Sequence, residues 1–241
     1  MLREASTTAE YTLADQQRMT RARRYFEWQA RLATEQLGRR VLEVGCGMGN
    51  FTRHLLDREM VVGIDVVEDC VSRLRDRFPG QPNLVVRRMD IQDPEFRQLK
   101  QYRPDSVVCL NVLEHVPDDR RALEHIHDVL PAGGRAVFIL PAFESLYGPI
   151  DANLGHFRRY SKQPWRELVA AAGLRPRVVR YINSVGCIGW WVNAKVFKRT
   201  EQSEDQIAIF DSLIVPVLSR VERWVEPPIG QSIFTVLERT G

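Results

Sequence analysis

The sequence predicts an α/β fold in which a doubly wound sheet is covered by helices on both faces. Two observations predict it. Short apolar segments alternate with amphipathic segments between positions 38 and 142, and glycine or proline punctuates several of the junctions. Strands buried on both faces read as continuous apolar runs, and a helix between two such strands makes them parallel. At 241 residues, the chain is expected to form one domain.

The predicted elements follow in order along the chain. A cap helix is expected over 13–37, because apolar residues recur there at helical spacing and Gly38 can end it. Strands are expected within 41–44, 60–66, 83–91, 104–116, 135–142, 175–183 and 231–239. Helices are expected over 51–58, 67–78, 118–130 and from Ser161 to Gly173. The domain thus divides into the cap (1–37), a core (38–142), a loop, helix and strand (143–183), an apolar helical insertion (184–230) and the last strand (231–241).

Composition excludes several classes of protein. The 34 cationic residues nearly balance the 31 acidic ones, leaving a net charge of +3 that does not indicate nucleic-acid binding. The four cysteines form no CxxC pair, which favours buried free thiols in a reducing compartment. The first residues, MLREASTTAE, lack the apolar core of a secretory signal, and no apolar run approaches a membrane span. We therefore expect a cytoplasmic protein.

The segment VLEVGCGMGN (41–50) predicts that the backbone approaches a ligand after the first strand. Gly45, Gly47 and Gly49 permit that approach, and loops after such strands bind ligands in doubly wound sheets. The dinucleotide fingerprint fits imperfectly, because Asn50 stands where it has its last glycine. Glu43 would repel a pyrophosphate, so it favours a ligand with a positively charged group.

Two further acids stand at strand ends. Asp65 lies twenty residues after Gly45, where a carboxylate accepts hydrogen bonds from ribose hydroxyls. Asp90 ends the third strand in Met89-Asp90-Ile91, where it can accept from an adenine amino group. Together the acids predict an elongated adenosine ligand with a cationic tail.

VLEVGCGMGNFT, VVGIDV, MDI and CLNVLEHVPDD resemble, in order, the motifs of class I S-adenosylmethionine-dependent methyltransferases. The resemblance implies a Rossmann-like seven-stranded sheet with an antiparallel last strand, and S-adenosyl-L-homocysteine as a product. It implies that Glu43 lies near the methionine amino group, Asp65 on the ribose and Asp90 on the adenine. The full set of implied cofactor-binding residues is Glu43, Gly45, Cys46, Gly47, Asn50, Asp65, Val66, Met89, Asp90, Ile91 and Asn111.

Methyl transfer from a sulfonium mainly requires alignment of the acceptor and, for some acceptors, removal of a proton. His156, in LGHFRRY, is the first candidate for the base, with an ordering role in its loop as the alternative. His115 and Tyr147 are further candidates for the catalytic set. The candidate acceptor-binding residues are Arg158, Arg159, Tyr160, Trp190 and Trp191.

No metal is predicted. Asp151 and Asn153 could supply oxygen ligands, but nothing in the sequence pairs them with the loop after the fourth strand. The Asn-Pro-Pro-Tyr type of signature found in methyltransferases that act on nucleic-acid amino groups is also missing, which argues against DNA as the acceptor.

The insertion at 184–230 pairs Trp190 and Trp191 with basic residues. This composition fits a lid or pocket wall, a peripheral contact with a membrane surface, or a contact in a homo-oligomer. LYGPIDANLGHFRRYS, together with the Trp-rich insertion, resembles a bacterial methyltransferase subgroup found near or fused to glycosyltransferases. That resemblance implies a lipid, lipid-linked sugar or polyketide-like acceptor.

The sequence therefore predicts an enzyme that transfers a methyl group to a hydroxyl, or alternatively an amine or a carbon, of a hydrophobic small molecule. RNA and protein remain alternative acceptors. A nicotinamide-dependent oxidoreductase and a non-catalytic S-adenosylmethionine-binding module are the alternatives from other classes.

Overall fold

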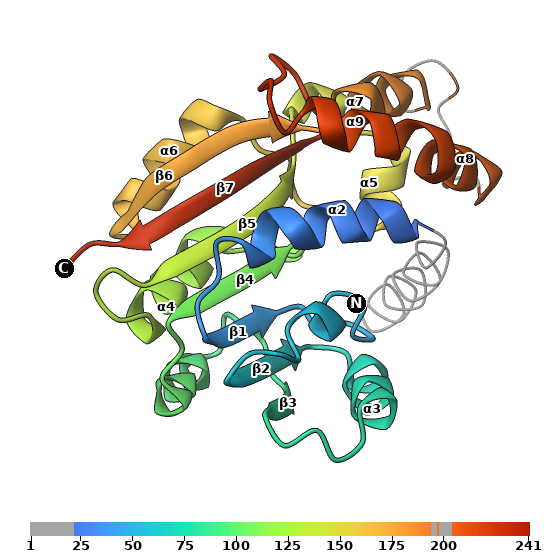
Figure 1. The fold of residues 1–241 in the computed structure, drawn as a ribbon. Coiled ribbons are helices and arrows are strands. Elements are labelled where there is room, and N and C mark those ends of the chain that lie inside the picture. The colour runs from blue at the N-terminus through green and yellow to red at the C-terminus, as the bar shows by residue number, and fades with distance from the viewer. Residues whose placement is uncertain (1–21, 194–196, 198–203) are drawn as a thin grey trace.

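The computed structural model describes residues 22–193, 197 and 204–241. Its strands form one seven-stranded sheet in the order β3-β2-β1-β4-β5-β7-β6 (Figure 1). Their bounds are β1 Arg40–Val44, β2 Met60–Asp65, β3 Leu84–Arg88, β4 Ser106–Leu110, β5 Arg135–Pro141, β6 Leu174–Ile182 and β7 Ser232–Arg239. Strands β1 to β5 pair in parallel, whereas β7 runs antiparallel to both β5 and β6. The predicted doubly wound sheet with an antiparallel last strand is confirmed.

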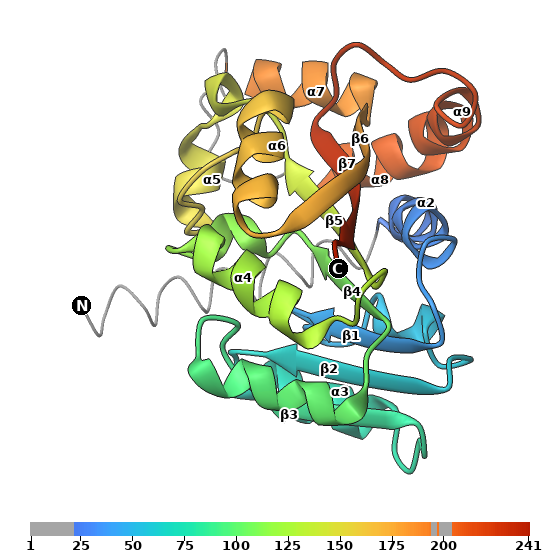
Figure 2. The same ribbon diagram turned by 90° about the vertical axis from the view of Figure 1, so that its left-hand side faces the viewer.

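The helices lie on both faces of this sheet. Their bounds are α2 Arg23–Thr34, α3 Glu68–Arg77, α4 Asp119–Val129, α5 Pro149–Asn153, α6 Lys162–Ala171, α7 Ser184–Trp191, α8 Glu204–Ile209 and α9 Val215–Val221. Helices α4 and α6 cover one face, and α2 and α9 cover the other (Figure 2). Side chains alternate along each strand between the two faces of the sheet. Leu42 packs in the core under α4 and α6, and its neighbour Val41 packs in the core under α2 and α9.

The cap helix and the segment after the glycine loop depart from the prediction. The described part of the cap is α2, and residues 13–21 of the predicted helix lie outside the described residues. The helix expected over 51–58 is instead a single 3₁₀ turn, Thr52–His54. The Thr52 hydroxyl donates to a Glu43 carboxylate oxygen at 2.7 Å, and the following hydrogen bonds span three residues rather than four. The buried acid thus anchors the turn.

Two further local predictions need adjustment. The fourth strand ends at Leu110, and the rest of the expected segment forms a 3₁₀ turn at Leu113–His115. The sequence reading also missed a 3₁₀ helix at Pro94–Tyr102, which begins with proline and buries Phe96 and Leu99.

All four cysteines are buried and free, as predicted. Among the described helices, none has the length and apolarity required to cross a membrane.

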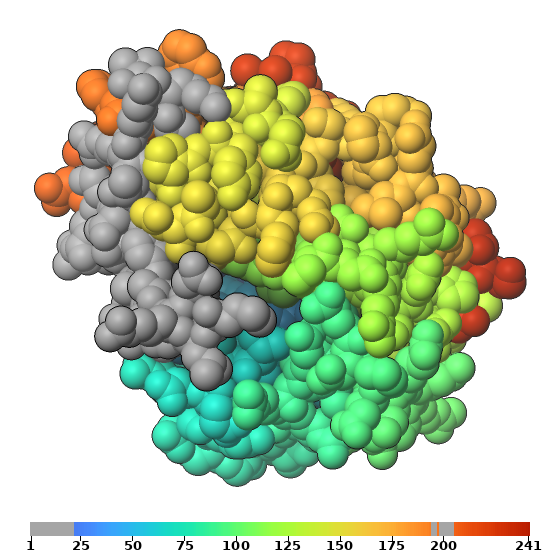
Figure 3. Space-filling model, turned by 180° about the vertical axis from the view of Figure 1, so that it is seen from behind, coloured from blue at the N-terminus to red at the C-terminus, as the bar shows by residue number. Residues whose placement is uncertain are grey.

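The carboxyl ends of the parallel strands open toward a hollow. In the space-filling view, this hollow lies between the yellow segment that contains α5 and the cyan segment that contains α3 (Figure 3). Strand ends from β1, β2 and β4 reach it, so residues far apart in sequence meet there.

Candidate active site

The glycine loop turns sharply after β1. Gly45 has φ +75°, and a Cβ at this position would lie 2.2 Å from a methyl carbon of Val112. The amide groups of Gly45 and Cys46 both donate to the carbonyl of Ile64, at 2.8 and 3.0 Å. This close turn brings backbone from the loop against β2, and only glycine fits at its first position.

Asp65, at the end of β2, holds the loop from the other side. One carboxylate oxygen accepts from the Gly47 amide at 2.9 Å, and the other accepts from the Val67 amide at 2.9 Å. Burial raises the pKa of Asp65, and these backbone hydrogen bonds oppose the rise. Asp65 therefore has a structural role in the loop that the sequence reading did not include.

Glu43 is the most deeply buried of the three strand acids. It is 4% exposed, and the Thr52 hydroxyl is its hydrogen-bond donor. Burial raises the pKa of Glu43 to about 8, with the neighbouring Asp65 carboxylate adding to the rise. A carboxyl group held in this way gains most from a ligand that brings a positive charge beside it.

These residues line one cavity of about 1280 Å³. All eleven residues that the sequence assigns to the cofactor line it, together with His115, His156, Arg159 and Trp190. Tyr147, Arg158, Tyr160 and Trp191 are not among its lining residues. The structure therefore brings the predicted cofactor set together and separates the predicted acceptor set.

The residues outside the lining make other contacts or are exposed to solvent. The Tyr147 hydroxyl donates to the His156 carbonyl at 2.7 Å, and Trp191 is half exposed. Arg158 pairs with Asp119 at 2.8 Å. Tyr160 is buried, and its hydroxyl donates to the same Asp119 at 3.1 Å.

Arg159 lines the cavity but has its charge partner already. Its guanidinium donates to Asp151 at 2.9 Å and lies 4.6 Å from the Trp190 ring centre. It also donates to the Ala142 carbonyl at 3.1 Å. Both arginines are thus tied to carboxylates of this chain, and neither presents an unpaired charge to an acceptor.

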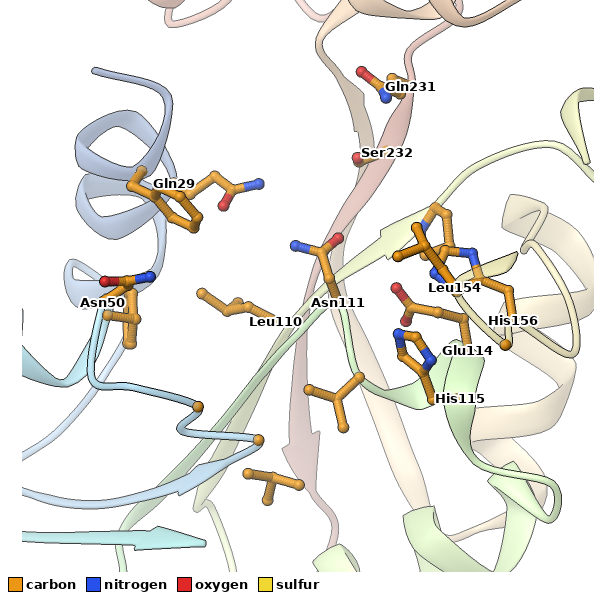
Figure 4. A pocket seen from close by; sticks show the side chains of 18 of the residues that line it. Gln29, Asn50, Leu110, Asn111, Glu114, His115, Leu154, His156, Gln231 and Ser232 are labelled. Carbon is orange, nitrogen blue, oxygen red and sulfur yellow. The ribbon is translucent and has the colours of Figure 1, made fainter. Parts of the chain in front are cut away.

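At the other end of the cavity, two histidines meet a buried carboxyl group. The rings of His115 and His156 lie 4.6 Å apart, edge to face, and Glu114 from the same 3₁₀ turn as His115 lies beside them (Figure 4). The His156 Nδ1 lies 2.8 Å from an Asp151 carboxylate oxygen. The sequence offered no link between Asp151 or Asn153 and the loop after β4. In the structure His156, which Asp151 holds, brings the loop after β5 against His115 in the loop after β4.

Burial shifts the titration of two members of this cluster. It lowers the pKa of His115 to about 3, with the neighbouring His156 adding to the effect and a hydrogen bond to the Leu154 carbonyl opposing it. It raises the pKa of Glu114 to about 7, although the charges of His156 and Arg159 act in the opposite direction. Glu114, His115 and His156 each place one ligand atom within 4.8 Å of the others, so the set could also hold a metal ion.

The cap helix and the insertion roof the cavity. Ala22, Tyr25, Phe26 and Gln29 from α2 and its N-cap line it, as do Ile188 of α7 and Ile207 of α8. Asp211, which follows α8, accepts from the Arg24 and Tyr25 amides at 3.2 and 2.8 Å. This acid caps the first turn of α2 and joins the two parts of the roof.

Known proteins that are similar to this chain include methyltransferases. A family model described as a methyltransferase domain matches residues 17–179. Ubiquinone biosynthesis O-methyltransferases are similar over part of the chain: the protein of Acinetobacter baumannii is 32% identical over 104 residues, covering 42% of this chain and 43% of that one. The protein of Idiomarina loihiensis is 34% identical over 107 residues, covering 42% of each. The chain therefore spans less than half the length of these curated relatives in the match.

Solved structures share the fold. A putative methyltransferase in complex with the Haloferax volcanii Trm112 methyltransferase activator has a TM-score of 0.66 at 20% identity, covering 98% of this chain and 97% of that one. An S-adenosylmethionine-dependent methyltransferase from Mesorhizobium loti has a TM-score of 0.59 at 18% identity, covering 89% and 98%. Taken with the family model and the sheet order, these similarities identify the chain as a class I S-adenosylmethionine-dependent methyltransferase.

Proposed function

We propose that this methyltransferase acts on a hydroxyl oxygen of a hydrophobic acceptor, such as a lipid or a lipid-linked sugar. The observation that carries the proposal is the single cavity of 1280 Å³ that has a cofactor-type loop at one end and the histidine cluster at the other. Pockets for one small molecule usually enclose about 300–1,000 Å³. The larger volume supports a site for cofactor and acceptor together.

At the cofactor end, Glu43 would contact the methionine amino group, Asp65 the ribose hydroxyls and Asp90 the adenine amino group. The burial of Glu43 supports its assignment, because an ammonium group would relieve the cost of its ionisation. The side chain of Asn111, just after β4, lines the cavity between this end and the cluster, a position that suits contact with the methionine portion.

At the acceptor end, the hydroxyl would lie beside His156. The His156 ring is held by Asp151, which Arg159 holds in turn, so its position is fixed before the acceptor arrives. His115 is neutral at physiological pH because burial keeps its pKa low. An imidazole oriented in this way can accept the hydroxyl proton as the oxygen attacks the methyl carbon.

The surface around the roof supports a hydrophobic acceptor. Of thirteen exposed large apolar side chains among the described residues, eleven lie between positions 185 and 229. Ile188, on α7, is both exposed and part of the cavity lining, so the apolar surface continues into the site. An apolar tail, or a membrane that presents the acceptor, would fit this surface. The relatives named ubiquinone biosynthesis O-methyltransferase support an oxygen atom as the acceptor.

The test uses methyl-labelled S-adenosylmethionine, the purified protein and a cell extract, followed by separation of organic and aqueous phases. We expect label in the organic phase, bound through a base-stable ether linkage. Label only in the aqueous phase would contradict the hydrophobic acceptor, and sensitivity of that label to ribonuclease or protease would identify RNA or protein instead. His156→Ala should lose at least 100-fold in turnover with S-adenosylhomocysteine affinity unchanged. His54→Ala, a histidine outside the cavity lining, is the matched control.

A further inference from the structure

We propose that Glu114, His115 and His156 bind a divalent transition-metal ion at the acceptor end of the cavity. The three side chains come from two loops more than 40 positions apart, and one ligand atom from each lies within 4.8 Å of the others. Two ligands of a tetrahedral ion at bond lengths of about 2.0–2.1 Å lie about 3.4 Å apart. Small side-chain rotations would therefore close the site around an ion.

Glu114 supplies independent evidence for a ligand. The residue is 1% exposed, it lines the cavity, and its Oε2 has no hydrogen-bond partner among the described residues. Leaving a buried polar oxygen unpartnered is costly, and buried carboxylates are normally paired or coordinate a metal. In Figure 4 the Glu114 carboxyl group and the His115 ring lie side by side at this end of the pocket. An ion between them would give Oε2 the partner it lacks.

Both histidines are oriented as metal-binding histidines are. Such a histidine donates its second ring N–H to a carboxylate or a backbone carbonyl, which fixes the tautomer and leaves the other nitrogen for the metal. The His156 Nδ1 meets Asp151 at 2.8 Å, which leaves Nε2 for an ion. His115 makes its hydrogen bond with the Leu154 carbonyl.

The support extends one layer further out. Asp151 is fully buried, accepts from the Gly148 amide at 2.9 Å and pairs with Arg159 at 2.9 Å. Asp151 is therefore held firmly enough to orient His156. In this proposal Asp151 orients the metal ligand His156 and does not bind the ion itself, which is the role that the sequence analysis considered for it.

The donor set selects the class of ion. Two imidazole nitrogens and one carboxylate favour zinc, manganese, iron or cobalt, whereas magnesium and calcium prefer sites made of oxygens. Three protein ligands leave at least one coordination position open, and all three proposed ligands line the cavity.

The catalytic use of the ion rests on the proposed function, although its binding does not. A hydroxyl bound at the open position would have a lowered pKa and release its proton to solvent. Its oxygen would then attack the methyl carbon as the carbon–sulfur bond breaks and the electron pair stays on sulfur, giving the methyl ether and S-adenosylhomocysteine. If the ion takes part in the reaction, His156 acts on the hydroxyl as a ligand of the ion and does not accept the proton itself.

The experiment measures binding of Co²⁺ and Zn²⁺ to tag-free protein that has been treated with a chelator. We expect one ion per chain by calorimetry and a visible Co²⁺ spectrum typical of nitrogen and oxygen ligands. His115→Ala and His156→Ala should each weaken binding at least 100-fold, and the near-isosteric Glu114→Gln at least tenfold. His54→Ala should bind as the unchanged protein does. Absence of saturable binding at millimolar ion, or equal binding by the three variants, would overturn the site.

A second readout separates this inference from the proposed function. Affinity for S-adenosylhomocysteine is measured on each variant, and an unchanged value shows that the fold and cofactor end are intact. Methyl transfer is then measured with and without the chelator. Activity that the chelator abolishes and Zn²⁺ or Mn²⁺ restores supports the metal-assisted step. Full activity in chelator would overturn the metal-assisted step and leave the proposed methyl transfer standing. Saturable ion binding with no labelled product under any condition would contradict the proposed function and leave the metal site standing.

Discussion

Replacing Glu43 by glutamine should make the ligand-free protein more stable and the cofactor complex weaker. Glu43 is buried, and its pKa of about 8 compares with an ordinary value of 4.5. Between these values the native state keeps a proton that the unfolded state has lost, so the stability contribution of Glu43 falls as pH rises through this range. At 1.36 kcal/mol per pKa unit, the cost reaches about 3 kcal/mol at pH 7 and about 5 kcal/mol above pH 8.

Glutamine has the same shape and carries no charge, so Glu43→Gln should recover much of this cost. At pH 7 the gain of up to about 3 kcal/mol corresponds to a rise in Tm of roughly 6–12 °C. The gain should be larger at pH 8 and should vanish well below pH 4.5, where the carboxyl group is protonated in both states. The exposed Glu35→Gln, at the end of α2, is the control and should give no such pH-dependent gain.

Cofactor binding should change in the opposite direction. A carboxylate and an ammonium group about 4 Å apart interact by about 4 kcal/mol at an effective dielectric constant of about 20, and ionising Glu43 at pH 7 costs about 1.4 kcal/mol of that. Glu43→Gln should therefore weaken S-adenosylmethionine binding at least tenfold in calorimetry. The affinity of the unchanged protein should rise from pH 6.5 to 8, and this rise should be absent in the variant. A variant that melts lower at pH 8, or binds the cofactor as tightly as before, would refute this account of Glu43.

Three further substitutions test the loop and the roof. Asp65→Ala should weaken S-adenosylhomocysteine binding at least tenfold in calorimetry and also lower Tm, because the carboxylate accepts two backbone amides; unchanged affinity would remove Asp65 from the cofactor site. Gly45→Ala should abolish detectable cofactor binding, because the added Cβ would collide with Val112. The control is Gly80→Ala, at a position that also has positive φ but has open space around it. This variant should lose only about 1 kcal/mol in the free energy of unfolding, measured with denaturant. Asp211→Ala should cost about 1–2 kcal/mol in denaturant unfolding as a lost helix cap, and equal stability would show that the α2 contact contributes nothing.

The sheet, and the end of the cavity that contains the glycine loop, were predictable because their signals are local in sequence. Each buried parallel strand is a short apolar run, and the acids that line the cavity follow directly at or near the ends of these runs. The glycine loop carries its own conformational signal, as the positive φ of Gly45 shows.

The end of the cavity with the histidine cluster was less predictable because its contacts join distant segments. Nothing near Glu114 in the sequence indicates that His156 will lie against it, and the two meet only after β5 and the following loop have folded. Arg158 and Arg159 are adjacent and equivalent in sequence, yet one pairs with Asp119 and the other with Asp151. The prediction of a helix over 51–58 was wrong for a related reason, because the Glu43 carboxyl group that anchors Thr52 lies on β1.

The position of β7 has a consequence for how this protein is made. Strand β6 has β7 as its neighbour in the sheet, and β5 has β4 on one side and β7 on the other. Until residue 239 has left the ribosome, β6 has no strand to pair with and one edge of β5 stays open. Synthesis at about 5–20 residues per second makes that interval several seconds for the segment from β6 to β7. During those seconds the nascent chain presents an unpaired edge beside the apolar insertion, and such an edge can pair with another chain.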